Sequence, residues 1–376
     1  MNAATPDELL QRDPAEPSPT PTDFRLDPEL FGTLEASLLG AVPSLTRPQV
    51  TQLAGISLDH AHELWAALGF PPPQDDEDEL FTPEDVEALR TLRGLVDSGL
   101  IQSETESSLA RSMGRSFARL AEWEIAEVAA HVLSEETTDL DTAARLIEET
   151  LPAIERLQNY IWRRHLASAA GRLLLHATGA ADAVPMTVGF ADIVGFTRRT
   201  RSLSADELAA MIERFESVVN AVIAEHHGRI IKAIGDEVLF VVDDPVDAAR
   251  IALVLSRADQ EDEDFPQVRV GMAHGNVLRR LGDVFGEVVN IASRLTSLAR
   301  PGKILMSREL ADLLRDRVHD GEVEFRVRRA RTGTVKGYSR LETWALKGPK
   351  ETRERSERRR DKPLDVITDL VMPTTD

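Results

Sequence analysis

The spacing of apolar residues changes sharply near residue 186, and this change limits the fold more than any other feature of the chain. Residues 104–177 contain almost no Pro or Gly, and their Leu, Ile, Ala and Trp recur three or four residues apart, as in amphipathic helices. From 186 to about 348, short β-rich runs alternate with helical segments. The sequence therefore predicts an all-helical domain over 25–180, followed by an α/β domain over 186–348.

The second region follows the order βαββαβ, with additional elements after it. This order is typical of an α/β (α+β) sandwich of ferredoxin-like type. Gly235-Asp236 forms the turn of a predicted hairpin. The predicted elements are a strand over 186–196, a helix over 204–228, two strands over 229–242, a helix over 245–258, a strand over 267–278 and a helix over 285–302.

The sequence of the first region predicts a short helix–turn–helix within 45–70, with a break at Gly55. A new helix is predicted to begin at Thr82-Pro83. Thr is a good N-cap and Pro suits the first helical position. We expect about three long helices over 104–177, with a boundary at Pro152. The two ends complete the organisation: a disordered leader over 1–24, rich in Pro, Ser and Thr, and a charged tail over 349–376.

Composition excludes several classes of protein. The chain has no Cys, which excludes disulfide scaffolds, Cys-ligated zinc, iron–sulfur clusters and Cys nucleophiles. Its formal net charge of −20 gives no general attraction for nucleic acid or an anionic membrane, so nucleic acid is an unlikely partner. No apolar run approaches the roughly 20 residues that span a bilayer, and the start lacks the features of a signal peptide. We expect a soluble cytoplasmic protein with no membrane contact.

Two aspartates stand out in the second region. Asp192 ends a predicted strand, and Asp236 lies in the turn of the hairpin. If the two strands are neighbours, the carboxylates come close together, which is unfavourable unless a cation joins them. Ligation by oxygen alone favours Mg²⁺ or Mn²⁺ over zinc. Taken singly, each aspartate more often has an ordinary structural role: Asp236 as a turn residue and Asp192 as a helix N-cap.

Three further polar positions allow two interpretations each. Asn290 and Arg294 are four residues apart and share a helix face, where they could bind phosphate oxygens or form a solvated surface. Lys232 interrupts an apolar strand, so it needs a partner or an edge position. The combination is more specific than any one residue: FADIVGFT, KAIGDE and GDVFGEVVNIASRL, in this order and spacing, closely resemble the class III nucleotidyl cyclase catalytic domain.

The resemblance implies an adenylate cyclase, which converts ATP to 3′,5′-cyclic AMP and pyrophosphate with two Mg²⁺ or Mn²⁺ ions. It also implies roles for individual residues. These are metal binding by Asp192, by the backbone of Ile193 and by Asp236; adenine recognition by Lys232 and Asp283; ribose orientation by Asn290; charge stabilisation at the α-phosphate by Arg294; and, from less diagnostic flanking sequence, triphosphate binding by Lys303 and Lys336. The absence of Cys favours ATP over GTP, because guanylate-specific relatives carry Glu and Cys-like residues at the two adenine-reading positions.

In this family the active site lies between two catalytic domains, so the resemblance implies a homodimer with shared sites. The segment 45–100 bears a looser resemblance to a MerR-type DNA-binding domain, but its recognition stretch, 59–63, is not basic. The whole chain resembles actinobacterial soluble cyclases in which an N-terminal helical domain regulates the catalytic dimer. We therefore expect regulation and dimerisation by 25–180, with pH or a small ligand as the input. The alternatives are a non-catalytic cyclase-like module that binds nucleotide, and a transcription regulator.

Overall fold

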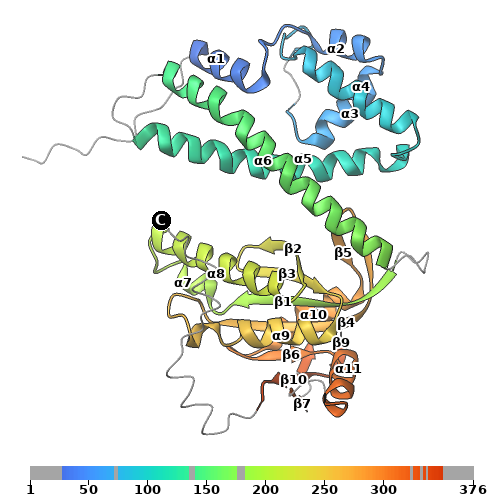
Figure 1. Ribbon diagram of the computed structural model, residues 1–376, viewed down its shortest axis with the longest axis vertical. Coiled ribbons are helices and arrows are strands. Elements are labelled where there is room, and N and C mark those ends of the chain that lie inside the picture. Colours follow the sequence, from blue (N-terminus) through green and yellow to red (C-terminus); the bar gives the residue numbers. More distant parts are fainter. Residues whose placement is uncertain are drawn as a thin grey trace, which may run out of the picture. The chain divides into compact units, whose positions relative to one another are not determined.

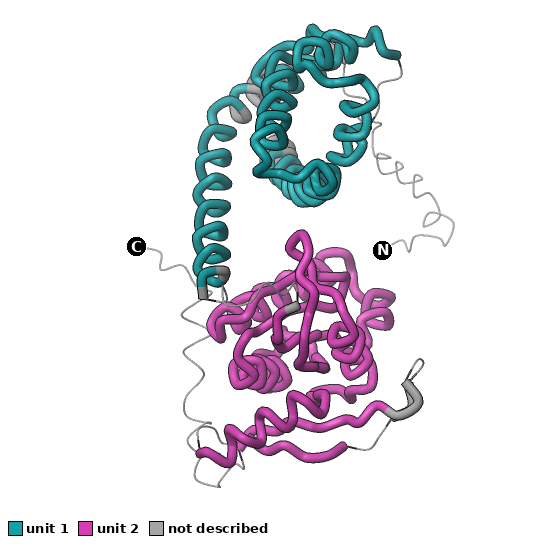
Figure 2. Tube along the Cα trace, turned by 90° about the vertical axis from the view of Figure 1, so that its right-hand side faces the viewer, with its two compact units in different colours: residues 1–177 teal, residues 178–376 magenta. Residues whose placement is uncertain are grey.

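The chain folds as two compact units, residues 1–177 and 178–376, in this computed structural model (Figure 2). The leader 1–24, Lys336 and nearly all of the tail 349–376 lie outside the described residues. No helix in the described part of the chain is both long and apolar enough to cross a membrane. The structure describes residues 28–71, 75–134, 140–175, 183–321, 325–330, 333–335 and 338–349.

The described elements of the first unit are all helices, apart from an isolated β-bridge between Leu45 and Phe81 (Figure 1). Short helices come first, and two long ones follow. Its helices are α1 (Pro28–Leu39), α2 (Arg47–Ala54), α3 (Leu58–Leu68), α4 (Pro83–Asp97), α5 (Ser103–Ser134) and α6 (Leu140–Leu175).

A small apolar core joins α2, α3, α4 and α5 in this unit. Trp65 stacks on Phe81 with their ring centroids 4.6 Å apart. Gly55, in the left-handed region at φ 71°, ends α2 where the sequence predicts a break. At the start of α4, the carboxylate of Asp85 accepts hydrogen bonds from the backbone N–H and the hydroxyl of the N-cap residue Thr82, as in one half of a capping box. The buried core residues are Val50, Ala54, Ala61, Leu64, Trp65, Val86, Leu89 and Ala110.

The predicted helix boundary at Pro152 is wrong, because Pro152 lies inside α6. An internal Pro removes one backbone hydrogen bond and crowds the carbonyl four residues earlier, at a cost of about 3 kcal/mol. The 36-residue helix continues through it. Consequently the described part of 104–177 contains two long helices in place of about three.

The second unit contains a mixed sheet flanked by helices, as the sequence predicts (Figure 1). The short helix α7 and the strand β5 were not predicted. Its strands are β1 (Ala183–Ile193), β2 (Arg229–Ile234), β3 (Glu237–Val242), β4 (Val268–Arg280), β5 (Asp283–Phe285), β6 (Ile304–Met306), β7 (Arg326–Arg329), β8 (Gly333–Val335), β9 (Tyr338–Leu341) and β10 (Trp344–Lys347). Its helices are α7 (Phe196–Arg199), α8 (Ala205–Glu225), α9 (Pro245–Leu255), the 3₁₀ turn Ala258–Gln260, α10 (Glu287–Leu298) and α11 (Arg308–His319).

The main sheet has the strand order β2-β3-β1-β4-β6-β10-β7, with β5 paired to the end of β4. The first four positions are those of the βαββαβ unit, with β1 antiparallel to both β3 and β4. β6 then runs parallel to β4. The register places Asp192 of β1 opposite Glu237 of β3 on one side and opposite Arg269 of β4 on the other. This register determines which polar residues meet at the end of β1.

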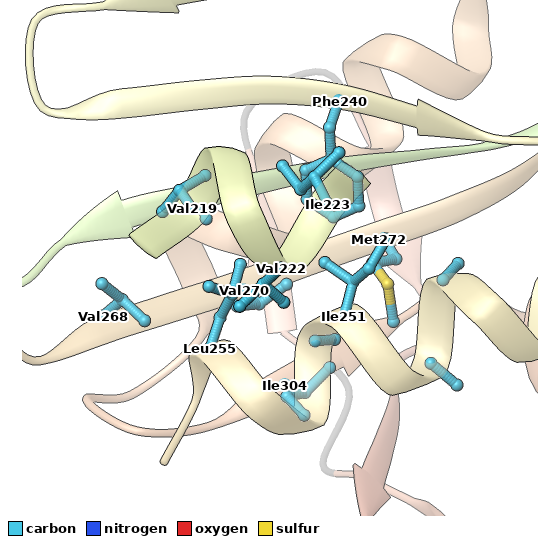
Figure 3. Close-up of a cluster of buried hydrophobic side chains, with 14 of the residues drawn as sticks. Val219, Val222, Ile223, Phe240, Ile251, Leu255, Val268, Val270, Met272 and Ile304 are labelled. Atoms are coloured by element: carbon cyan, nitrogen blue, oxygen red, sulfur yellow. The ribbon is translucent and has the colours of Figure 1, made fainter. Parts of the chain in front are cut away.

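The two faces of the sheet have separate cores. Helices α8, α9 and α11 cover one face, where residues such as Phe215, Ile251 and Met306 are fully buried (Figure 3 shows part of this cluster). Helix α10 covers the other face, against Met186 and Ala273. Side chains alternate between faces along a strand. Thus Ala191 and Ile193 point into the α8–α9 core, and Asp192 lies on the α10 face.

Candidate active site

Asp192 and Asp236 meet at the end of β1. Asp192 is the penultimate residue of β1, and Asp236 occupies the turn between β2 and β3. Gly235, at φ 63°, permits this tight turn. The backbone N–H of Ile193 donates to the carbonyl oxygen of Asp236 at 3.0 Å, which ties the hairpin turn to the end of β1. The structure therefore brings together the two aspartates and Ile193, as the sequence predicts.

Arg269 is the basic partner of this site. Its Nε donates to the Asp192 carboxylate at 2.5 Å, and its guanidinium also donates to the carbonyl of Ser297 in α10 at 3.2 Å. The sequence reasoning missed Arg269. Its signal is a charged residue in an otherwise apolar strand, VRVGM, and only the β1–β4 register places it opposite Asp192.

Negative charge at the site exceeds what Arg269 balances. Burial raises the pKa of Asp192 above its ordinary value, the Arg269 guanidinium opposes that rise, and the Asp236 carboxylate adds to it. Burial also raises the pKa of Glu237 to about 7, and the nearby carboxylates of Asp192 and Asp236 contribute. Three carboxyl groups beside one guanidinium form an electrostatic environment that favours a further cation.

The donors at this site fit a magnesium-type ion. No group of three or more His, Asp or Glu side chains within the described residues could alone hold a metal. The available donors are two carboxylates with neighbouring backbone carbonyls, all of them oxygen. Mg²⁺ is commonly held by one or two carboxylates, with substrate phosphates and water as its other ligands. The site is therefore suited to a cation that arrives with a phosphorylated substrate.

Lys232 and Asp283 form an ion pair, with Nζ 2.6 Å from Oδ2. Lys232 is in β2 at one edge of the sheet, and Asp283 begins β5, with β3, β1 and β4 between them in the strand order. Asp283 also accepts from the backbone N–H of Val284 at 2.8 Å. Both side chains of the pair are partly exposed, 39% and 30%. Lys232 therefore has the partner that a Lys inside a strand needs, and the pair still offers a donor and an acceptor to solvent.

Asn290 and Arg294 lie one turn apart on α10, and both are exposed. The opposite side of α10 is buried through Ala292, Leu295 and Thr296. This burial fixes the helix against the sheet and points the Asn–Arg face outward. Within the described residues, neither side chain has a hydrogen-bonding partner of its own in this chain, so both are available to an external group.

Lys303 lies immediately before β6, and its carbonyl accepts from Val270 of β4 at 3.1 Å. It is thus at the same end of the sheet as Asp192, with β4 between the two strands. Its exposed side chain lines a pocket that contains none of the other predicted site residues. Lys336, the second predicted triphosphate contact, lies outside the described residues.

The chain is similar to several known proteins. The family described as "Adenylate and Guanylate cyclase catalytic domain" matches residues 180–348. An adenylate cyclase of Streptomyces coelicolor is 40% identical over 304 residues, which cover 80% of this chain and 79% of that protein. An adenylate cyclase of Glutamicibacter nicotianae is 37% identical, covering 88% of this chain and 84% of that protein. The crystal structure of an adenylate/guanylate cyclase/hydrolase from Silicibacter pomeroyi matches 46% of this chain and 100% of its own, at 28% identity and a TM-score of 0.39.

Proposed function

Because the chain belongs to the class III adenylate cyclases, which form cyclic AMP from ATP, we propose that two copies of the chain share the residues of each active site. Asp192 and Asp236 of one copy hold the metal ions and the triphosphate. Lys232, Asp283 and the exposed face of α10 on the other copy hold the nucleoside. Each dimer then has two equivalent sites.

The Lys232–Asp283 ion pair is the observation that supports this proposal most directly. It places an ammonium donor and a carboxylate acceptor side by side, both within reach of solvent. N1 of adenine accepts a hydrogen bond and the exocyclic amine donates one, so the pair matches the edge of adenine. Guanine presents the reverse pattern at this edge, and its binding would leave both charged groups without a partner. The pair therefore selects ATP over GTP.

The reaction is an attack by the 3′-hydroxyl of ATP on its own α-phosphorus, with pyrophosphate as the leaving group. Asn290 orients the ribose so that the hydroxyl is in line with the bond that breaks. Arg294, one turn further along α10, donates to the oxygens of the α-phosphate, where negative charge develops. The described residues around the site include no obvious protein base, and we assign none.

Asp192 and Asp236, with the backbone of Ile193, are the groups that would hold divalent cations. The chemistry such ions supply is acidification of the attacking hydroxyl and neutralisation of the leaving pyrophosphate. We propose two ions per site, Mg²⁺ or Mn²⁺. Arg269 pairs with Asp192 in this structure. Lys303 and Lys336 are further proposed contacts of the triphosphate, by resemblance.

The test is an assay of cyclic AMP by the full-length protein with ATP and Mg²⁺ or Mn²⁺, beside Asp236→Ala and a GTP series. We expect metal-dependent cyclic AMP, no product from the variant, and little cyclic GMP. Full activity of Asp236→Ala would contradict the metal site proposed here. An equal rate with GTP would contradict the proposed recognition of adenine by Lys232 and Asp283.

We further propose that the first unit regulates the catalytic dimer and helps to form it. Its two long helices expose several large apolar side chains, which are suited to contacts with another chain. Helix α3, at the place of a recognition helix, has no Lys or Arg, so we do not assign it DNA binding. The exposed apolar residues are Met113, Phe117, Trp123, Ile125, Leu157, Tyr160, Ile161, Trp162, Leu166 and Leu174.

The proposed input is pH or a small ligand. Helix α3 contacts α5 through a polar pair, in which His60 Nε2 lies 3.1 Å from the buried carboxylate of Glu106. The test compares the specific activity of full-length protein, residues 178–376 and Glu106→Gln across pH. Identical profiles for full-length protein and the catalytic unit would contradict regulation by the first unit.

A further inference from the structure

A basic pocket lies where β6 begins and β10 ends. It is a pocket of about 200 Å³ whose lining includes four cationic side chains and no acidic one. The cations come from separate parts of the chain: one follows α9, one precedes β6, one opens β7 and one ends β10. They are Arg257, Lys303, Arg326 and Lys347, and Ser256 and Gln260 add polar groups.

Two of the guanidinium groups meet at one buried residue, Gly348. Arg326 Nε donates to the Gly348 carbonyl at 2.7 Å. A Cβ atom added to Gly348 would lie 2.4 Å from a guanidinium nitrogen of Arg257, so that side chain rests directly on the glycine. Arg257 and Arg326 are both partly buried. Like charges held this close in partial burial repel each other unless an anion lies between them.

These four cationic side chains also differ from many others in this chain, because they have no acidic partner in the part of the chain that the structure describes. Its net charge is −20, and many of its arginines lie beside a carboxylate, such as Arg214 at Asp262 and Arg269 at Asp192. Within the described residues, no ion pair joins Arg257, Lys303, Arg326 or Lys347 to an acidic side chain. The pocket is therefore a local concentration of unbalanced positive charge on an acidic protein.

Lys303 is the one lining residue that is also a proposed triphosphate contact, and the pocket contains no other residue assigned to the candidate active site. Its apolar lining residues Ile304 and Leu346 belong to the core under α8, α9 and α11, and Arg257 follows α9. The adenine-reading pair and the Asn–Arg face of α10 belong to the opposite face of the sheet. A bound anion could therefore occupy this pocket while substrate occupies the active site.

We propose that this pocket binds a small oligophosphate: free inorganic pyrophosphate, or the phosphate chain of a nucleotide. Guanidinium groups bind phosphate oxygens through paired hydrogen bonds, and ammonium groups add point charges. A water molecule takes about 30 Å³ of liquid volume, so the space holds several waters or one compact anion. Pyrophosphate is the second product of the reaction that this family catalyses. The proposal does not depend on the roles assigned above to residues other than Lys303, and its test leaves Lys303 unchanged.

The test is calorimetric titration of the full-length protein with inorganic pyrophosphate in EDTA, at roughly physiological ionic strength so that weak surface attraction is screened. The test variant is Arg257→Gln combined with Lys347→Gln. The matched control is Arg328→Gln, which removes an exposed charge from the same sheet but not from this pocket. A parallel titration with ATP shows whether a nucleotide's phosphate chain binds through the same residues.

We expect the wild type and Arg328→Gln to bind pyrophosphate alike. The double variant should bind at least about tenfold more weakly, or lose one site per chain, because two charge-assisted contacts are removed. Unchanged affinity and stoichiometry in the double variant would overturn the proposal, as would an equal loss in Arg328→Gln or no binding by the wild type. If the double variant fails to fold, Lys347→Gln alone, at an exposed side chain, keeps the comparison valid.

Discussion

At the scale of single residues, the proposed recognition of the nucleotide base depends on one contact. Lys232 and Asp283 are 51 positions apart, and each satisfies the other's charge at 2.6 Å. Such a pair, partly open to water, adds little to stability by itself. In the function proposed here its value lies in specificity, because each member holds the other in the position proposed to contact the base.

Asp283→Asn tests this role. The substitution keeps the size of the side chain but removes its charge and replaces one acceptor oxygen with a donor. We expect kcat/KM for ATP to fall about tenfold or more, and the preference for ATP over GTP to narrow. Steady-state kinetics with both nucleotides measure the effect. Glu213→Gln, at an exposed position of α8, is the matched control; an equal loss in both variants would contradict the assignment.

His274 gives a prediction about pH and stability. Burial lowers the pKa of His274 below its ordinary value, although Glu309 opposes that shift. Its Nδ1 lies 3.0 Å from the hydroxyl of buried Thr187. Because the unfolded chain binds a proton more readily at this position, the free energy of unfolding should decrease as pH falls below about 6.5, the ordinary pKa of His.

Chemical denaturation of the wild type and His274→Gln across this pH range measures that decrease. The contribution of a single proton to the slope is at most about 1.4 kcal/mol per pH unit. The variant should lose this part of the slope and keep the rest. Parallel curves for the two proteins would show that His274 does not titrate on unfolding in this range.

At the scale of elements, the position of α10 depends on close contact with β4. A Cβ atom added to Gly271 would lie 2.1 Å from the backbone nitrogen of Thr296 and 2.6 Å from the carbonyl of Ala292. The backbone of the helix therefore rests directly on the strand. Because α10 carries Asn290 and Arg294, this glycine determines how far both side chains stand from the sheet.

Gly271→Ala should push α10 away from β4. We expect a loss of about 1–3 kcal/mol in the free energy of unfolding, typical of overpacking, and a lower kcat in the molecules that remain folded. Gly94→Ala is the control, since Gly94 lies in α4 with nothing within 4 Å of the added atom. Removing a glycine from an exposed helix should leave stability equal or slightly higher. A stable and fully active Gly271→Ala would contradict this account of the interface.

At the scale of the whole molecule, one catalytic unit contains every proposed site residue that the structure describes. Its proposed metal-binding residues and its proposed nucleoside-binding residues nevertheless form two separate groups among the described residues of one chain. Among the described residues, no hydrogen bond or ion pair links Asp192 or Asp236 to Lys232 or Asp283. An arrangement in which each copy donates one group to each site accounts for both facts. It also makes activity depend on association.

Mixing two inactive variants tests this arrangement. Asp236→Ala removes a proposed metal ligand, and Arg294→Ala removes the charge proposed to act at the α-phosphate. When the two are mixed in equal amounts, half the dimers are mixed and each has one complete site, so activity should recover to about a quarter of the wild type. Cyclic AMP formation before and after co-refolding measures it. Continued inactivity, with mixed dimers shown by size and mass, would place each site within one chain.

Interactions between residues close in the sequence determine much of the secondary structure of this protein. The apolar periods of 2 and 3.6 residues give the strands and helices of the α/β unit in their order. Caps such as Ser204, which accepts from the Glu207 backbone, mark where helices begin. The polar residues of the candidate site also stand out, because charges and amides inside apolar segments need a reason. Each of these signals involves residues a few positions apart, which is why the sequence alone contains them.

Only the tertiary structure decided which of those residues meet. The contact of Arg269 with Asp192 depends on the register of β1 against β4, and the Lys232–Asp283 pair brings together strands at distant places in the sheet. Pro152 shows the converse, since its local preference for a helix end is overridden within α6. The cationic side chains of the pocket beside Gly348 come from four separate parts of the chain. Sheet order and register are set by burying two apolar faces at once, a property of the whole unit that no short segment encodes.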